Sequence, residues 1–222
     1  MAPTLYSARR TIPLPEVVLS RILAILHAAS LATLIAVSAA SAEPLSTEAA
    51  LEDRVMGNAD APVTIIEYAS LTCPHCAAFH KETLPKVKAE WIETGKAKLI
   101  YRDYPTGPVA VSLAASMIAR CAPEDRYFAF LGALFDTQKN WATSPDPIGA
   151  LAKVAQLGGM PRADVDKCLE DEALLDGIRE RALDGQMEFG IESTPSFVVN
   201  GRVVRGNLAY ADFADILEQA GK

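Results

Sequence analysis

Two cysteines in one short motif, Cys-Pro-His-Cys at residues 73–76, could carry out redox chemistry. Such a pair can close into a reversible disulfide, and its thiolate form is the species that attacks another disulfide. An apolar run at 63–69, which is short and rich in β-branched residues, is typical of a buried strand. A helical pattern at 77–93 follows the motif. We therefore expect the first cysteine at the N-terminus of a helix that begins directly after a strand.

A helix N-terminus would favour ionisation of Cys73. Unpaired backbone N–H groups and the helix dipole stabilise a negative charge there. Pro74 suits the first helical position, where its missing N–H would have no partner. His75 could support the thiolate through its charge and a hydrogen bond, or it could be a solvent-exposed side chain of no consequence. The simpler alternative for Cys73 and Cys76 is a structural disulfide without turnover.

Metal binding is the other chemistry that these residues could offer. His80 comes one helical turn after Cys76, so Cys73, Cys76 and His80 resemble a partial ligand set. A closed zinc site needs a fourth ligand, and no second group of Cys and His stands out in the sequence. Ala77 occupies the place at which a haem-attachment motif has histidine. We therefore predict no metal and no cofactor, with His80 on one face of the helix.

Three further residues outside the motif carry chemical groups of interest. Glu67 is a charged residue in the apolar run, and a buried carboxylate there could pass a proton to or from Cys76. The alternative is an edge or surface glutamate. The other two, Cys121 and Cys168, lie in helical stretches 47 residues apart. In an oxidising compartment the even cysteine count favours pairing, and the spacing favours Cys73–Cys76 and Cys121–Cys168 over other connectivities. Two buried free thiols are the alternative.

The remaining pattern places a long helical block between two groups of strands. After the motif, a helix to about residue 94 is expected to kink near Pro85. Asn200-Gly201 is typical of a two-residue hairpin turn. The order is β-α-β, a helical block, then β-β-α. The expected strands are 63–69, 97–102, 196–200 and 203–205; the expected helices are 47–54, 74–94, 109–120, 124–137, 148–157, 162–170, 172–189 and 210–220.

The start of the chain resembles a secretory signal peptide. Arg9, Arg10 and Arg21 form a basic lead, residues 22–42 contain no Lys, Arg, Asp or Glu, and this run ends in Ala40-Ser41-Ala42. A basic region, an apolar region and a small-residue cleavage site predict export with cleavage after residue 42. An uncleaved membrane anchor and a twin-arginine signal are the alternatives.

Charge and length limit the classes of function. The 222 residues carry a net charge of −7, and the three arginines of the lead make the rest more acidic still. Such a surface does not suit nucleic acid or anionic lipid. The predicted division is a signal peptide at 1–42, a first part of the main domain at 43–106, an inserted helical subdomain at 107–189 and a second part of the main domain at 190–222.

The motif after a strand, together with Ser193-Thr194-Pro195-Ser196 before a late strand, resembles the DsbA-type thiol:disulfide oxidoreductases of the bacterial periplasm. The resemblance covers roughly residues 57–220. It implies an α/β, thioredoxin-like fold with an inserted helical subdomain. It also implies that Pro195 is a cis-proline facing the disulfide rather than an ordinary turn proline. Thr194 departs from the valine of the best-known family members, and this position tunes substrate release and redox poise.

The resemblance further assigns roles to three residues of the first half. Cys73 would be the exposed nucleophile, Cys76 its buried partner, and Glu67 the buried acid near the active site. The implied function is an exported dithiol oxidase that introduces disulfides into reduced, unfolded secreted proteins of the periplasm. A DsbB-like membrane quinone reductase would re-oxidise it. The alternatives are a disulfide isomerase, a dedicated thiol reductant, or a chaperone that uses the fold without redox turnover.

Overall fold

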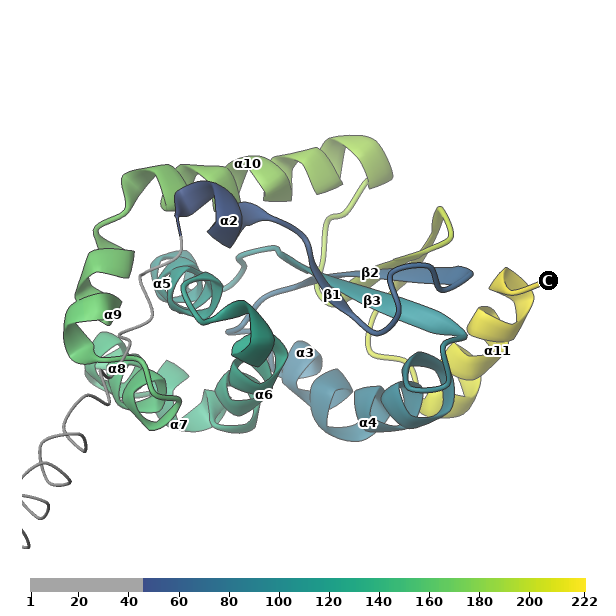
Figure 1. Ribbon diagram of the computed structural model, residues 1–222, viewed down its shortest axis with the longest axis horizontal. Coiled ribbons are helices and arrows are strands. Elements are labelled where there is room, and N and C mark those ends of the chain that lie inside the picture. Colours follow the sequence, from purple (N-terminus) through teal and green to yellow (C-terminus); the bar gives the residue numbers. More distant parts are fainter. Residues whose placement is uncertain (1–45) are drawn as a thin grey trace, which may run out of the picture. The chain divides into compact units, whose positions relative to one another are not determined.

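The run at 63–69 forms the central strand of a five-stranded sheet. In the computed structural model, which describes residues 46–222, the strand order is β1-β3-β2-β4-β5. β2 and β3 are parallel, and the other neighbouring pairs are antiparallel (Figure 1). The strands are β1 Arg54–Met56, β2 Val63–Ala69, β3 Ala97–Asp103, β4 Ser196–Val199 and β5 Arg202–Arg205.

Helices cover both faces of this sheet (Figure 1). The π turn after α3, with α4 and α11, packs on one face through an apolar cluster that includes Phe79, Phe197 and Phe213. α10 lies along the other face, where a Cβ on Gly185 would clash with the Tyr68 ring. A glycine therefore lets this helix approach the sheet closely. The helices of these layers are α2 Thr47–Leu51, α3 Pro74–Ala78, α4 Leu84–Val87, α10 Glu172–Phe189 and α11 Tyr210–Ala220.

The helical block predicted between β3 and β4 is present. Its packing surrounds an apolar cluster that also takes in the two motif cysteines. The helix predicted over 124–137 is a 3₁₀ turn followed by α6, and the short helix α7 that comes after it was not predicted. The segments of this block are α5 Val109–Arg120, a 3₁₀ turn at Glu124–Arg126, α6 Tyr127–Asp136, α7 Gln138–Ala142, α8 Pro147–Leu157, α9 Arg162–Leu169 and α10.

The helix after the motif is interrupted twice by wider π-helical turns, at Phe79–Thr83 and Lys88–Ile92. Pro85 has no N–H and would clash with a carbonyl one turn earlier in a regular α-helix. The Leu84 N–H instead bonds to the Phe79 carbonyl, five residues back. The kink expected near Pro85 therefore takes the form of π turns, which recur at functional sites in helices.

A short edge strand was missed by the sequence pattern. The segment after α2 was predicted to continue as helix to Arg54, but Arg54–Met56 forms β1, antiparallel to β3. Arg54 is 3% exposed, and its guanidinium donates to the Ala49 carbonyl. The guanidinium also lies over the Tyr127 ring, 5.8 Å from its centroid, so the segment, which lacks a clear apolar period, has contacts with a distant part of the chain.

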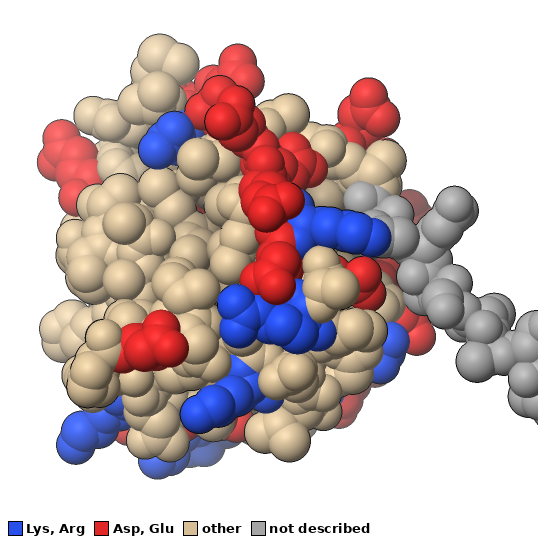
Figure 2. Space-filling view, turned by 90° about the vertical axis from the view of Figure 1, so that its left-hand side faces the viewer, with Lys and Arg blue, Asp and Glu red and all other residues tan. Residues whose placement is uncertain are grey.

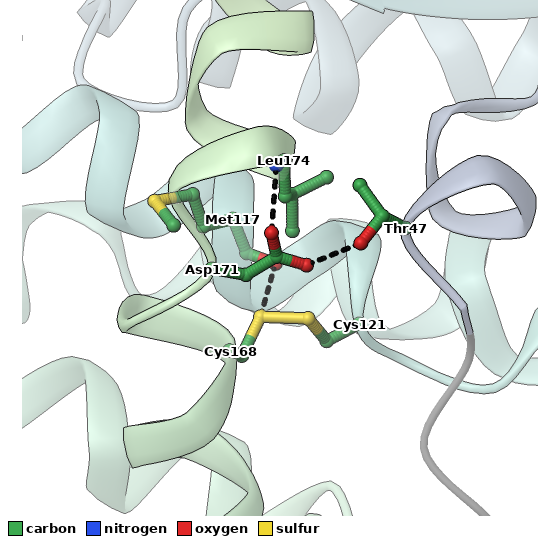
Figure 3. Close-up of a disulfide and its surroundings, with 6 residues drawn as sticks. All are labelled: Thr47, Met117, Cys121, Cys168, Asp171 and Leu174. Atoms are coloured by element: carbon green, nitrogen blue, oxygen red, sulfur yellow. Dashed lines mark hydrogen bonds between the residues drawn. A yellow bond between two sulfur atoms is a disulfide. The ribbon is translucent and has the colours of Figure 1, made fainter.

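Cys121 and Cys168 form a disulfide between the end of α5 and α9, with 6.3 Å between their Cα atoms (Figure 3). Beside it, Asp171 caps α10 by accepting from the Leu174 N–H at 2.9 Å. The Thr47 hydroxyl donates to the other oxygen of Asp171 at 2.6 Å. The disulfide and this cap tie α2, α5, α9 and α10 together.

The Cys121→Ala/Cys168→Ala double variant should lose stability. The bond closes a loop of 47 residues, so we expect the free energy of unfolding to fall by about 2–4 kcal/mol. Urea unfolding of the two proteins measures the difference. Alkylation of denatured, unreduced protein with mass detection first checks that the pair is bonded. Equal stability of a bonded wild type and the double variant would contradict the expectation.

The predicted signal peptide at 1–42 lies outside the described residues. Within residues 46–222, no helix has the length and apolarity to cross a membrane. Figure 2 views the end of the molecule formed by the helical block, where a run of Asp and Glu side chains lies beside a few Lys and Arg side chains. That face therefore has no broad basic surface of the kind that binds nucleic acid.

Candidate active site

Cys73 lies where strand, helix and a late loop meet. It is the N-cap residue of α3, with Pro74 at the first helical position as predicted. The Thr194-Pro195 peptide bond is cis, and the Cys73 thiol donates to the Thr194 carbonyl at 3.4 Å. The fold therefore brings the motif and the Thr-Pro pair together across 121 residues of sequence.

The surroundings of Cys73 favour its thiolate. A hydrogen bond from the Cys76 thiol is the largest cause, and it holds the pKa of Cys73 at about 5 against an ordinary 9.0. Burial opposes this shift, while Thr194 and the backbone N–H groups of His75 and Cys76 add to it. These N–H groups are the helix N-terminal donors that the sequence predicts as anion stabilisers. These surroundings therefore favour the thiolate form of Cys73 over the thiol near neutral pH.

Exposure differs between the two cysteines, although less than the resemblance implies. Cys73 is only 9% exposed, and Cys76 is fully buried. Burial, followed by the hydrogen bond to Cys73 and the charges of Cys73 and Glu67, raises the pKa of Cys76 far above its ordinary value. The expectation of an exposed Cys73 needs correction, because this residue packs in the apolar cluster of the helical block and its thiol contacts the Thr194 carbonyl. Both thiols are free, as a reduced pair.

His75 stabilises the Cys73 thiolate through its backbone N–H rather than through its ring. Its side chain is exposed, whereas its N–H supports the Cys73 thiolate. No hydrogen bond or ion pair of its ring appears among the contacts of the described residues. The sequence-based expectation of a supporting imidazole therefore has no contact in this structure to carry it.

Glu67 is a buried residue of β2 and makes an unexpected pair. Its carboxylate is fully buried, and the Nε2 atom of His80 lies 3.0 Å and 3.1 Å from its two oxygens. The His80 side chain is 6% exposed, so it is not a surface histidine of the helix. Among residues 46–222, no three His, Cys, Asp or Glu side chains are grouped as a metal site would require.

Hydroxyl groups connect the motif loop to the Thr194 loop. The Thr72 hydroxyl donates to the Thr106 carbonyl at 2.8 Å, and the Ser70 and Ser112 hydroxyls are 2.8 Å apart. The Thr106 and Thr194 hydroxyls are 3.3 Å apart. These contacts join the end of β2, the segment after β3 and the residue before the cis-proline. They therefore hold the Cys73 thiol next to the Thr194 carbonyl.

Gln138 secures the same loop from the helical block. Its side-chain amide, on α7, donates to the carbonyls of Leu71 and Cys73, each at 2.8 Å. Gln138 is 8% exposed. Sequence reasoning missed this role, because a single glutamine in a helix looks like a surface residue. The helical block therefore does more than cover the motif, since it fixes the backbone of the nucleophile.

The chain matches known proteins over most of its length. A family profile described as "Thioredoxin" matches residues 49–219. This chain belongs to that thioredoxin family. Its fold is also that of DsbA structures: alpha-DsbA1 of Wolbachia pipientis is 28% identical, with a TM-score of 0.70 over 77% of this chain and 91% of that one. The resemblance to DsbA-type proteins and the thioredoxin-like fold class with an inserted helical region are thereby confirmed.

Two curated relatives of this thioredoxin family member carry names that concern disulfides. The "Putative protein-disulfide oxidoreductase" of Rickettsia bellii is 31% identical over 67% of this chain. The chain spans 57% of that protein's length. The "Disulfide bond formation protein D" of Bacillus subtilis is 28% identical over 76% of this chain and 75% of its own length.

Gln138→Leu should destabilise this thioredoxin-family protein. The substitution leaves the carbonyls of Leu71 and Cys73 without their side-chain donor in a buried place, so we expect a loss of about 1–3 kcal/mol in the free energy of unfolding. Gln156→Leu, at an exposed position of α8, is the matched control, and we expect a change of less than about 0.5 kcal/mol. Urea unfolding of the reduced proteins measures both. Equal losses would contradict a specific role for Gln138.

Proposed function

We propose that this protein is an exported thiol:disulfide oxidoreductase that introduces disulfides into other proteins. The observation that carries the proposal is the difference in pKa between the thiols of Cys73 and Cys76. The pKa of Cys73 is about 5, whereas burial raises that of Cys76. A dithiol whose first member is a stabilised thiolate has a stable reduced form and a reactive disulfide. That combination suits a donor of disulfides.

The reaction begins when a substrate thiolate attacks Cys73 Sγ in the oxidised pair. The Cys73–Cys76 bond breaks, its electron pair goes to Cys76 Sγ, and a mixed disulfide forms between Cys73 and the substrate. A second substrate thiolate then attacks the substrate sulfur of that bond. Cys73 leaves as a thiolate, for which its low pKa makes it a good leaving group. The substrate gains a disulfide, and the protein gains the two electrons.

Named residues would serve this sequence of steps. The carbonyl of Thr194, beside the cis-proline Pro195, accepts from the Cys73 thiol, and it would align a substrate strand at the reacting sulfur. Glu67 would exchange protons with Cys76, and the Cys121–Cys168 disulfide would serve structure only. In this proposal the helical subdomain spans 107–189, between main-domain parts at 43–106 and 190–222.

The substrates and the compartment follow from the same chemistry. Reduced, unfolded secreted proteins offer accessible thiols, and the basic and apolar lead at residues 1–42 supports export to the periplasm with cleavage of a signal peptide. Disulfides persist in that oxidising compartment. A DsbB-like quinone reductase in the membrane would return the pair to its oxidised form. Names of relatives that concern disulfide bond formation support this reading.

Oxidative refolding tests the proposal. The oxidised protein is mixed with a reduced, unfolded secreted enzyme that has several disulfides, without other oxidant, and the recovery of that enzyme's activity is followed. We expect stoichiometric transfer of one disulfide per molecule of protein, and none from a Cys73→Ser/Cys76→Ser variant. Transfer in the opposite direction, with reduction of a native disulfide by the dithiol form, would instead support a reductant. Equal assistance from the double variant would support a chaperone.

A further inference from the structure

Two threonine hydroxyls form a hydrogen bond close to the redox motif. The Oγ1 atoms of Thr106 and Thr194 are 3.3 Å apart, and either hydroxyl can be the donor. Each hydroxyl has one hydrogen to donate and can also accept. Among the hydrogen bonds of residues 46–222, the Thr106 side chain has Thr194 as its single partner. The direction of this bond can therefore reverse without loss of another contact of Thr106.

The backbone of Thr106 is held from the side of the motif. Its N–H donates to Ser70 Oγ at 3.2 Å, and its carbonyl accepts from the Thr72 hydroxyl at 2.8 Å. Ser70 is 1% exposed, so this support lies in the core. Thr72 directly precedes Cys73 in the chain. The Thr106 side chain therefore has a fixed place relative to Cys73, from which it reaches Thr194.

Thr194 offers Cys73 two groups of opposite character. Its carbonyl accepts from the Cys73 thiol at 3.4 Å. A thiolate has no hydrogen to donate, so the carbonyl oxygen faces a negative sulfur once Cys73 ionises. A side-chain hydrogen bond from Thr194 is among the largest causes that lower the pKa of Cys73. The thiol is therefore bound by the carbonyl of Thr194, whereas the thiolate depends on its hydroxyl.

Building on the proposed function, we propose that Thr106 is a positioning residue that turns the Thr194 hydroxyl towards Cys73. When Cys73 is a thiolate, the Thr106 hydroxyl donates to Thr194 Oγ1, and the Thr194 hydroxyl donates to Cys73 Sγ. When Cys73 is part of a disulfide, its sulfur carries no charge, and the Thr194 hydroxyl donates to Thr106 instead. The two hydroxyls thus exchange the roles of donor and acceptor in each catalytic cycle.

Only the directions of hydrogen bonds change in this step. When a substrate thiolate attacks the sulfur bound to Cys73, the electron pair of the broken bond goes to Cys73 Sγ, which leaves as a thiolate. Rotation of the two hydroxyls then supplies a donor to that charge, and no proton leaves either oxygen. Two hydroxyls aligned in one direction polarise each other, which strengthens both hydrogen bonds. Thr106 therefore stabilises the leaving group through Thr194.

Charged side chains do not take the place of this donor. The other donors to the thiolate are the second motif thiol and the backbone N–H groups at the start of α3. The side chain of His75 is exposed. On the loop before the cis-proline, Glu192 is exposed, and its charge, after burial, raises the pKa of Tyr104. The Thr194 hydroxyl is thus the group of this loop that stabilises the Cys73 thiolate.

The pH dependence of Cys73 alkylation in the reduced Thr106→Val protein tests the proposal. Valine has nearly the shape of threonine but no hydroxyl. We expect the midpoint of the alkylation rate to move upward by about 0.5–1 pH unit. Near neutral pH the equilibrium constant with glutathione should shift by the same factor, about 3- to 10-fold, towards the disulfide form of the protein, because the reduced form is less stabilised.

Two control variants isolate the effect of the hydroxyl. Thr106→Ser keeps the hydroxyl, so its midpoint should stay close to that of the wild type. Thr143→Val removes an exposed hydroxyl at the end of α7 and should leave the midpoint where it is. Thr106→Ala provides the same test as Thr106→Val if valine disturbs folding. A shift in Thr106→Ser as large as that in Thr106→Val would overturn the inference.

A double-mutant cycle separates positioning of Thr194 from an independent effect of Thr106. In the Thr194→Val protein there is no hydroxyl for Thr106 to direct, so the further change Thr106→Val should leave the midpoint unaltered. Additive shifts in the double variant, or an unchanged midpoint in folded Thr106→Val, would contradict the proposed role. A wild-type midpoint near the ordinary 9.0 would instead contradict the proposed function.

Discussion

Replacement of Cys73 by serine is expected to lower the rate of thiol–disulfide exchange by at least about a thousandfold. Serine keeps the size and the helix N-terminal place of the residue but offers no sulfur for a mixed disulfide. The Thr194 carbonyl and the backbone N–H groups of His75 and Cys76 face this one atom. The measurement is the rate at which a reduced, fluorescently labelled dithiol peptide is oxidised by the pre-oxidised protein.

Cys76→Ser is the matched companion to that variant. It retains the nucleophile at residue 73 but removes the buried thiol that resolves the mixed disulfide. Incubation with substrate disulfides should therefore trap a covalent complex, visible without reducing agent on a gel. Trapping by Cys73→Ser instead of Cys76→Ser would reverse the assignment of the two cysteines.

The second large effect is the pH dependence of Cys73. We expect the rate of its alkylation by iodoacetamide to rise with pH through a midpoint of about 5, against an ordinary thiol at 9.0. The measurement uses the reduced Cys76→Ala protein as well as the wild type. Because the hydrogen bond from Cys76 is the largest cause of the shift and alanine has no donor, the midpoint should move upward in that variant. A wild-type midpoint near 9 would contradict the site described above.

The same shift fixes how the equilibrium between the dithiol and the disulfide responds to pH. The pKa of Cys73 is lower in the folded, reduced protein than in an ordinary thiol, so the stabilisation of the reduced form is complete above about pH 9. It is lost as the pH falls towards 5. Between these limits reduction takes up two electrons and one proton. The reduction potential of the Cys73–Cys76 pair should therefore fall by about 30 mV for each unit by which the pH rises. Below pH 5 two protons are taken up, and the slope should approach about 60 mV per pH unit.

The local sequence was enough to predict the helices and strands that have a clear repeat of apolar residues or a clear terminating residue. The strand at 63–69 and the helices at 109–120, 172–189 and 210–220 were predicted with the bounds that the structure has. Apolar residues repeat along these segments, and Gly190 ends α10 in the left-handed conformation. The chemical motif was also local, since the two cysteines, the proline and the helix start all fall within a few residues.

The parts that sequence reasoning missed depend on contacts between distant residues. His80 was expected on a helix face, and its ring meets Glu67, 13 residues away on β2, and stacks on Phe135. Gln138 reaches carbonyls 65 and 67 residues earlier in the chain. β1 pairs with β3, more than 40 residues later in the chain. The pattern of apolar residues within one helix or strand does not predict contacts between residues that are far apart in the sequence. The order of strands and helices, by contrast, can be predicted from the apolar repeat and the turn residues.

The central claim is that Cys73 and Cys76 form an oxidising pair, and its most direct test is their reduction potential. The purified protein with Cys121→Ala/Cys168→Ala is equilibrated with glutathione buffers, so that only the motif contributes to the signal. We predict a potential above about −180 mV, more oxidising than glutathione itself. A value near −270 mV, as thioredoxin has, would contradict the claim and identify the protein as a reductant.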